Sequence, residues 1–143
     1  ETYINTPSVV YIDDYAHHPM ELSTVIESVK RLYPGKRIVG VFQPHLYSRT
    51  MDFAQEFADS LMPLDEIILL DIYPAREKPI PGISSKTILH KINKMSKYLC
   101  GKEELCNVLL ALAPEVLITL GAGDIDAIVP TIEKVFNEEL ETK

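Results

Sequence analysis

The sequence predicts a doubly wound α/β fold, in which a mostly parallel sheet carries helices on both faces. Short apolar runs rich in β-branched residues alternate with stretches whose apolar residues recur every three or four positions. The segments between the runs are long enough for right-handed crossover helices, which make the strands that they join parallel. The length of 143 residues suits a single domain with its own core.

Six short apolar segments are expected to form the sheet. The first main strand ends at a pair of aspartates, and the last one ends at a glycine-rich turn. The segment at residues 98–99 is the weakest, and the N-terminal one is expected to be an extra edge strand. The expected strands lie at residues 3–4, 9–12, 38–42, 67–70, 98–99 and 116–120.

Five segments have the spacing of amphipathic helices. Pro19 suits the first turn of its helix, because the N–H that proline lacks has no partner there. Ser48 is expected to cap the second helix, with Met51 and Phe53 on its inward face. The region from residue 73 to 85 holds three prolines and is expected to be a loop. The expected helices lie at residues 19–33, 48–61, 87–92, 103–112 and 125–139.

Composition and charge narrow the classes of function. The chain has 46% apolar and 24% charged residues, as an ordinary globular protein has. Its net charge of −7 argues against a general nucleic-acid binder, because phosphate contacts need clustered Lys and Arg. No apolar run approaches the ~20 residues of a membrane span and no leader is visible, which favours the cytoplasm. Cys100 and Cys106 are expected to be reduced, and the start at Glu1 is compatible with a piece of a longer protein.

Four polar loops are predicted to meet at one edge of the sheet. The carboxyl ends of parallel strands share an edge, and ligands of doubly wound folds bind there. Each of the four loops follows a predicted strand and is rich in groups that can bind ligands. These loops are residues 13–18, 43–49, 73–76 and 121–124.

The first of these loops begins with Asp13 and Asp14. Two carboxylates at the end of a strand can hold ribose hydroxyls or a hydrated Mg²⁺ ion. The alternative is that one of them caps the following helix or braces the loop by accepting backbone N–H bonds. We expect at least one of them to face a ligand.

The adjacent residues His17 and His18 are not expected to bind a metal. Neighbouring histidines in a turn point in different directions, and His45 and His90 lie in separate segments, so no zinc set is visible. A histidine fixed by hydrogen bonds can instead present one nitrogen to a substrate carboxylate or phosphate. The other histidine can simply fill the turn.

Arg49 lies in the first turn of a predicted helix, where the helix dipole disfavours a cation unless an anion is near. That position indicates a bidentate contact with a carboxylate or phosphate, and the alternative is an exposed side chain or an ion pair with Asp52. The run from Gly121 to Asp124 resembles part of a phosphate-binding turn, but a tight turn with Asp124 as helix cap is the simpler interpretation. The chain has no P-loop, so we expect it not to hold the triphosphate of ATP by itself.

Five motifs, taken together and in this order, closely resemble the C-terminal domain of the Mur ligases over essentially the whole chain. Each motif is modest alone, whereas the ordered set is specific. They are DDYAHHP at 13–19, FQPHLYSRT at 42–50, DIYPAR at 71–76, PIPG at 79–82 and GAGDI at 121–125.

The resemblance implies that residues 1–143 are one domain of a three-domain, ATP-dependent ligase of peptidoglycan synthesis. The expected reaction adds L-alanine to UDP-N-acetylmuramate through an acyl phosphate. The expected partners are these two substrates, ATP, and the N-terminal and central domains of the same enzyme, with no nucleic acid and no membrane. The central domain would hold most of the ATP and Mg²⁺, so this domain would carry no catalytic residue and would be inactive alone.

The resemblance also assigns roles to residues of the rim. Many relatives carry arginine where this chain has Leu46, so a second cationic contact is lost and the first has to suffice or receive help from the central domain. Arg49 is expected on the carboxylate of L-alanine, and His45 is the weaker of the two histidine candidates. The candidates are Asp13 and Asp14 for ATP, and Tyr15, His17, His45 and Arg49 for L-alanine.

Two alternatives remain at this point. The related ligase that reattaches a recycled murein tripeptide to the same UDP-sugar shares a similar aspartate–aromatic–Ala-His-His-Pro run. The Phe-Gln-Pro-His form of the second motif favours the alanine-adding branch. The other alternative is a non-catalytic, nucleotide-binding α/β module, which a P-loop domain encoded upstream would exclude.

Overall fold

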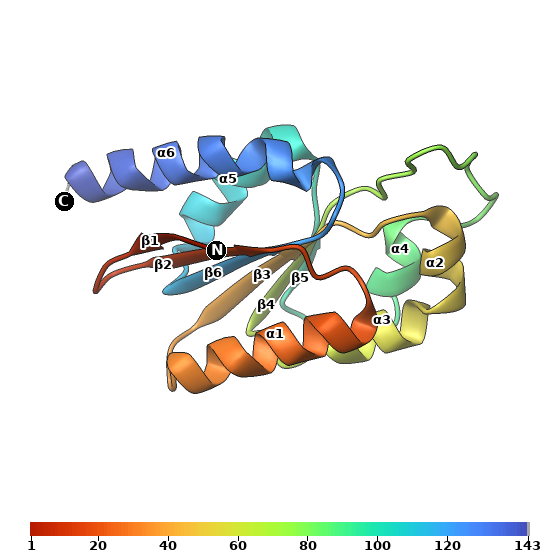
Figure 1. The fold of residues 1–143 in the computed structure, drawn as a ribbon, viewed down its shortest axis with the longest axis horizontal. Helices are drawn as coiled ribbons and strands as arrows, with labels where there is room; N and C mark the ends of the chain where they lie inside the picture. The colour runs from red at the N-terminus through yellow and green to blue at the C-terminus, as the bar shows by residue number, and fades with distance from the viewer. Residues whose placement is uncertain (143) are drawn as a thin grey trace.

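A twisted six-stranded sheet forms the middle layer of the computed structural model, which describes residues 1–142 (Figure 1). The strand order is β1-β2-β6-β3-β4-β5, and only the edge strand β1 is antiparallel to its neighbour. The predicted doubly wound, mostly parallel sheet is therefore confirmed, including the N-terminal edge strand. The strands are β1 (Thr2–Asn5), β2 (Val10–Asp14), β3 (Ile38–Phe42), β4 (Glu66–Leu69), β5 (Lys97–Leu99) and β6 (Val116–Leu120).

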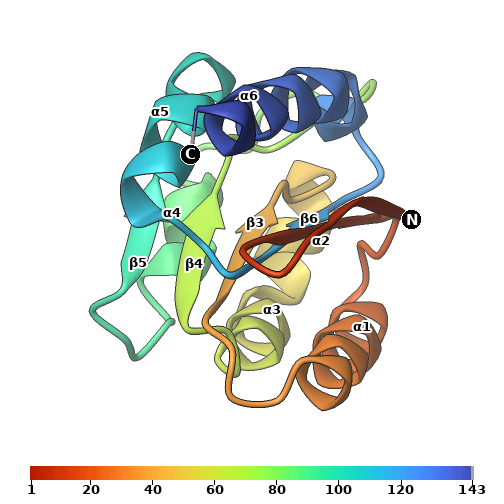
Figure 2. The ribbon, with the colours of Figure 1, turned by 90° about the vertical axis from the view of Figure 1, so that its left-hand side faces the viewer.

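Helices cover both faces of the sheet, as Figure 2 shows. One face carries α1 (Pro19–Leu32), α2 (Tyr47–Asp52), α3 (Ala54–Leu61) and α4 (Ser85–Leu89). The other face carries α5 (Lys102–Leu112), the 3-10 helix η1 (Asp124–Ile128) and α6 (Val129–Glu141). Among residues 1–142, no helix has both the length and the apolar character needed to cross a membrane.

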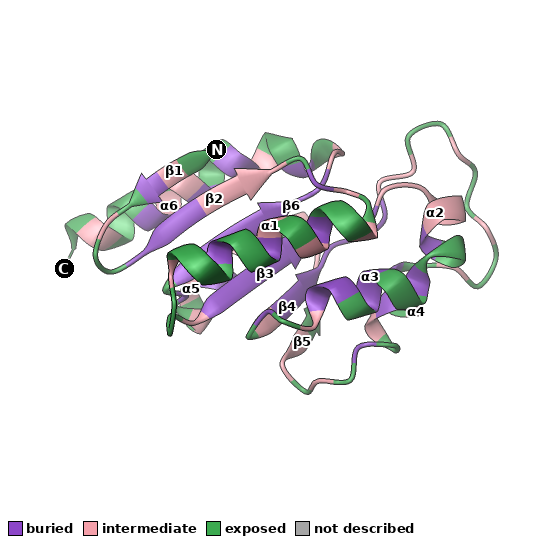
Figure 3. Ribbon diagram, turned by 60° about the horizontal axis from the view of Figure 1, so that its bottom comes forward, coloured by how far each residue is buried: buried purple, intermediate pink, exposed green. Residues whose placement is uncertain are grey.

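The sheet divides the interior into two hydrophobic cores. Ile38 and Phe42 of β3 point into the core under α1 and α3, whereas Val39 and Val41 point into the core under α5 and α6. This alternation is the period of two expected of a strand, and burial on both faces explains why β3 and β6 are continuous apolar runs. Figure 3 shows the central strands buried along their length.

The predicted helix over residues 48–61 is wrong as a single element, because it divides at Phe53. Ser48 does not cap it: the residue before α2 is Leu46, with a φ of 70°, and no side chain accepts a bond at that position. Met51 and Phe53 are 46% and 43% exposed, so their predicted inward position is also wrong. Thr50 takes the buried position instead and donates its hydroxyl to the carbonyl of Leu46.

Candidate functional site

The four polar loops do meet at one edge of the sheet, as the sequence predicts. Figure 3 shows the arrowheads of β2, β6, β3 and β4 pointing to the same side, where α2 lies. Backbone hydrogen bonds join the loops: Gln43 N–H donates to Leu120, and Gly121 N–H donates to Asp14. An isolated β-bridge joins His45 to Tyr73. This edge is called the rim below.

Asp13 is the last residue but one of β2, and its carboxylate accepts a hydrogen bond from a buried pair of hydroxyl groups. The hydroxyl of Thr119 donates to Asp13 Oδ1 at 2.6 Å and lies 2.9 Å from the hydroxyl of Tyr11. Partial burial raises the pKa of the Asp13 carboxyl above its ordinary value, and the bond from Thr119 opposes that rise. The second carboxyl oxygen of Asp13 makes no hydrogen bond within residues 1–142 and can accept one from a ligand.

The next two acidic residues brace the loop and the helix. Asp14 Oδ1 accepts the N–H of Ala16 at 2.9 Å, which fixes the turn after β2. Glu21 Oε1 accepts the N–H of His17 at 3.2 Å and of His18 at 3.0 Å, so it caps α1. Neither aspartate caps this helix. Glu21 was missed in the sequence, although a glutamate three residues after the cap position is a known signal.

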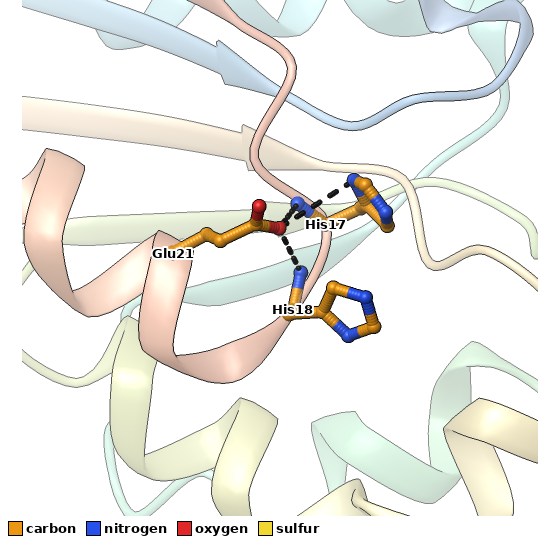
Figure 4. Close-up of side chains that lie close together, drawn as sticks. All are labelled: His17, His18 and Glu21. Atoms are coloured by element: carbon orange, nitrogen blue, oxygen red, sulfur yellow. Dashed lines mark hydrogen bonds and ion pairs between the residues drawn. The ribbon is translucent and has the colours of Figure 1, made fainter.

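The histidines of the rim lie closer together than their positions in the chain suggest. The ring centroid of His17 lies 4.6 Å from that of His18 and 5.9 Å from that of His45. His45 also contacts the ring of Tyr73, at 5.6 Å between centroids, whereas His90 lies apart from them at the end of α4. Figure 4 shows His17 and His18 with the carboxylate of Glu21 reaching towards them. The rim therefore gathers three imidazoles.

His45 is held in its neutral form more strongly than an ordinary histidine. Burial lowers its pKa from the usual 6.5, and the neighbouring charges of Arg49 and His17 lower it further. Its Nδ1 is buried and has no hydrogen-bond partner within the described residues. A neutral imidazole has one nitrogen that donates and one that accepts, so it can exchange a hydrogen bond with a ligand.

Arg49 lies on α2, and its charge lowers the pKa of both His45 and Glu77. Its guanidinium makes no hydrogen bond or ion pair within residues 1–142, so the alternative of an ion pair with Asp52 is not formed. Glu77, from the proline-rich loop, accepts bonds from the backbone N–H of Ser48, at 3.1 Å, and from its hydroxyl. These bonds lower the pKa of Glu77. Nothing in the sequence signals this contact, because 29 residues separate the partners.

Tyr15 completes the set of predicted residues and is 68% exposed. It lines an open hollow together with Asp14, His17 and Met20. The structure therefore brings His17, His45 and Arg49 to one part of the rim, and it places Tyr15 beside them at the surface.

The part of the rim under α5 is built differently. The side-chain amide of Gln43 donates to Asp124 Oδ1 at 2.6 Å and accepts the N–H of Ile125 at 2.9 Å. Lys102 donates to the other oxygen of Asp124 at 2.5 Å. Asp124 thus links two side chains and does not cap the following helix, which begins as η1. A cavity of about 240 Å³ lies beside this network.

The glycine turn after β6 serves this packing. A Cβ at Gly123 would lie 2.6 Å from Cγ of Tyr73 and 2.7 Å from Oε1 of Gln43, closer than real Cβ contacts allow. Gly121 has a φ of 145°, which side chains rarely adopt. The residue types of the turn are explained by close contacts within the protein.

Known proteins share both this sequence and this fold. A model of the family described as "Mur ligase, glutamate ligase domain" matches residues 2–123. The chain is 54% identical over 138 residues to a UDP-N-acetylmuramate–L-alanine ligase of Parabacteroides distasonis, which covers 96% of this chain and 30% of that protein. It is 53% identical over 135 residues to the ligase of the same name from Porphyromonas gingivalis, which covers 94% and 30%.

A solved structure agrees with these matches. The crystal structure of the UDP-N-acetylmuramate-alanine ligase MurC from Thermotoga maritima superposes with a TM-score of 0.70 at 25% identity, over 96% of this chain and 28% of that one. The chain spans about 30% of the length of the curated relatives that it matches. On these grounds the chain belongs to the Mur ligase family, as its glutamate ligase domain.

Proposed function

We propose that residues 1–143 are the C-terminal domain of a cytoplasmic, ATP-dependent ligase that adds L-alanine to UDP-N-acetylmuramate in peptidoglycan synthesis. The observation that carries this proposal is the 54% identity, over 96% of the chain, with a ligase of that name. The expected N-terminal and central domains of the same enzyme would bind the UDP-sugar and the triphosphate. This domain would then close over substrates that those domains hold.

The residues of the rim suit the amino-acid side of such a site. Within residues 1–142 the guanidinium of Arg49 makes no hydrogen bond or ion pair, and this is the group that pairs best with a carboxylate such as that of L-alanine. His45 is kept neutral by burial and by Arg49, so it can accept a hydrogen bond from the amine of L-alanine. His17 lies beside it and Tyr15 lines the adjacent hollow. We assign these four residues to L-alanine.

Asp13 and Asp14 suit the ribose of ATP. One oxygen of Asp13 accepts a hydrogen bond from Thr119, and one oxygen of Asp14 accepts a hydrogen bond from the N–H of Ala16. The second oxygen of each carboxylate can accept a hydrogen bond from a ribose hydroxyl group. The Mg²⁺ ion and the phosphates of ATP would lie mainly on the central domain, because this chain has no P-loop. Within this proposal the domain contributes positioning, and the acyl phosphate forms on the other side of the cleft.

The full-length protein encoded by the gene tests the proposal. Phosphate release from ATP is measured with UDP-N-acetylmuramate and L-alanine together, with each substrate omitted in turn, and with the recycled murein tripeptide in place of L-alanine. We expect release only when both UDP-N-acetylmuramate and L-alanine are present. Release with the tripeptide and not with L-alanine would assign the chain to the recycling ligase. No ligation with any acceptor would support a non-catalytic nucleotide-binding module.

A further inference from the structure

Three of the four histidines of the chain gather at one place on the rim. The sequence predicts no metal site, because His45 lies in another segment and neighbouring histidines in a turn are expected to point apart. In the folded chain the ring of His17 lies 4.6 Å from the ring of His18 and 5.9 Å from that of His45, between centroids. The fold therefore brings His45 close to the other two histidines, although it lies in a separate segment of the sequence.

The donor atoms of three side chains already lie within the reach of one ion. One ligand atom each from His17, His18 and Glu21 lie within 4.8 Å of one another. Figure 4 shows the rings of His17 and His18 near each other, and the Glu21 carboxylate directed at the backbone nitrogens of both residues and at one ring nitrogen of His17. Because zinc–nitrogen distances are about 2.0–2.1 Å, the side chains have to rotate to bring these atoms around one ion.

Two of the three donors are also held in orientation by the backbone. His17 Nδ1 lies 3.0 Å from the carbonyl oxygen of Tyr15, and a carbonyl only accepts, so Nδ1 carries the proton and Nε2 carries the free lone pair. The carboxylate of Glu21 is fixed by the backbone N–H groups of His17 and His18, which contact Oε1 and leave Oε2 free. Bonds of this kind orient ligands in metal sites.

We propose that His17, His18 and Glu21 form a binding site for a transition-metal ion of the zinc class, with His45 as the nearest further imidazole. Imidazole nitrogens with one carboxylate suit Zn²⁺, Ni²⁺ and Co²⁺, whereas Mg²⁺ takes oxygen ligands. The site is therefore chemically separate from the Mg²⁺ that accompanies ATP. Its three side chains come from one loop and the first turn of α1, so it needs no other domain.

The site would act on the enzyme by competition. His17 is assigned to the L-alanine side of the rim, so a bound ion would occupy the nitrogen that L-alanine needs. This consequence rests on the proposed function, whereas binding of the ion does not. In the full-length enzyme we expect Zn²⁺ to inhibit competitively with L-alanine.

Calorimetric titration with Zn²⁺ tests the binding on the untagged chain of residues 1–143. The background is C100S/C106S, so that thiols do not contribute, and a large excess of Mg²⁺ is present. We expect one ion per chain, with tetrahedral absorption bands when Co²⁺ replaces Zn²⁺. His18→Ala and Glu21→Gln should each weaken binding by about tenfold or more. His90→Ala, which removes an exposed histidine outside the cluster, should leave the affinity unchanged.

The variants are chosen so that the titration either supports or overturns the metal site. The glutamine of Glu21→Gln keeps an oxygen for the N–H groups that cap α1, so this variant decides the matter should His18→Ala unfold. No saturable binding, or equal losses in His18→Ala and His90→Ala, would overturn the metal site. One-to-one binding by the chain without inhibition of the full-length enzyme would leave the site standing and refute the role of His17 in binding L-alanine.

Discussion

The two parts of the rim differ in how their polar groups are used. Under α5, Gln43, Asp124 and Lys102 contact one another, and Gln43, which is 3% exposed, bonds through both atoms of its amide. Between α1 and α2, the guanidinium of Arg49 makes no hydrogen bond or ion pair within residues 1–142, and Nδ1 of His45 is buried without a hydrogen-bond partner there. We call the part under α5 the closed side of the rim and the part between α1 and α2 the open side.

The difference separates stability from binding. A polar group that is bonded on every side stabilises the fold and has nothing left for a ligand. A polar group left without a partner costs stability unless something outside the domain binds it. We infer that the closed side holds the loops in place and that the open side is where substrates meet this domain. Four experiments, from the largest expected effect to the smallest, test this division.

The chain of residues 1–143, assayed alone, should show no ATP-dependent ligation of L-alanine to UDP-N-acetylmuramate. The open side offers groups for positioning but no P-loop for the phosphates of ATP, so it is half of a site. Phosphate release and product formation are measured with the folded chain, and the full-length enzyme is the positive control. Turnover by the chain alone would mean that the open side is a complete site.

Replacing Arg49 by alanine in the full-length enzyme should raise KM for L-alanine by about 10- to 150-fold, because a charge-assisted contact contributes about 1.5–3 kcal/mol. KM for ATP and the free energy of unfolding should change little. Arg31→Ala removes an exposed arginine near the far end of α1 and serves as the matched control. Equal increases of KM for both substrates would contradict a role specific to the amino acid.

Gln43→Ala on the closed side should lower the free energy of unfolding by about 1–3 kcal/mol, because the buried N–H of Ile125 loses its acceptor. The control is Gln55→Ala, whose exposed side chain bonds only to Asp59 one turn later on α3. Urea denaturation of the chain measures both variants. A loss no greater than that of the control would show that the network is not structural.

The smallest effect concerns the pH dependence of stability. Burial raises the pKa of Asp124, but the bonds from Lys102 and Gln43 together outweigh burial, so the pKa lies below its ordinary value of 3.8. The unfolded chain then binds more protons, and the stability from Asp124, present above pH 3.8, is lost as the pH falls through the folded pKa.

Asp124 is partly exposed, so this contribution should be under about 1 kcal/mol. Urea midpoints at pH 7, 5 and 3.5 measure it, and Asp124→Asn should show a shallower fall between the last two values. If the stability of Asp124→Asn falls as steeply between these pH values as that of the unmodified chain, Asp124 does not contribute to the stability of the closed side.

Much of the fold could be predicted because its signals are local. The strand at residues 38–42 has the bounds that its apolar run predicts, and α1 begins at the proline expected to start it. The division of the helix at Phe53 could not be predicted, because helical spacing continues through that residue while its φ of −122° leaves the helix. The spacing of apolar residues along the sequence cannot show which of them, such as Met51 and Phe53, other parts of the fold leave exposed.

The composition of the rim was predicted, but its contacts were not. The rule that ligands bind at the carboxyl ends of parallel strands brought four loops together correctly. The contact between His17 and His45 joins the loops after β2 and β3, which β6, the last strand in the sequence, separates in the sheet. The contact between Ser48 and Glu77 likewise joins segments that no short-range pattern connects. Strand order and long-range pairing decide such neighbours.

Leu46 has a consequence for the engineering of this domain. Its positive φ is a conformation that costs a residue with a side chain about 1–3 kcal/mol, and bonds to Tyr73 and Thr50 hold it there. Glycine at this position would relieve the cost and raise thermostability. It would also give the backbone before Arg49 new freedom, so the variant that best survives heat would be a poorer candidate for a fast enzyme.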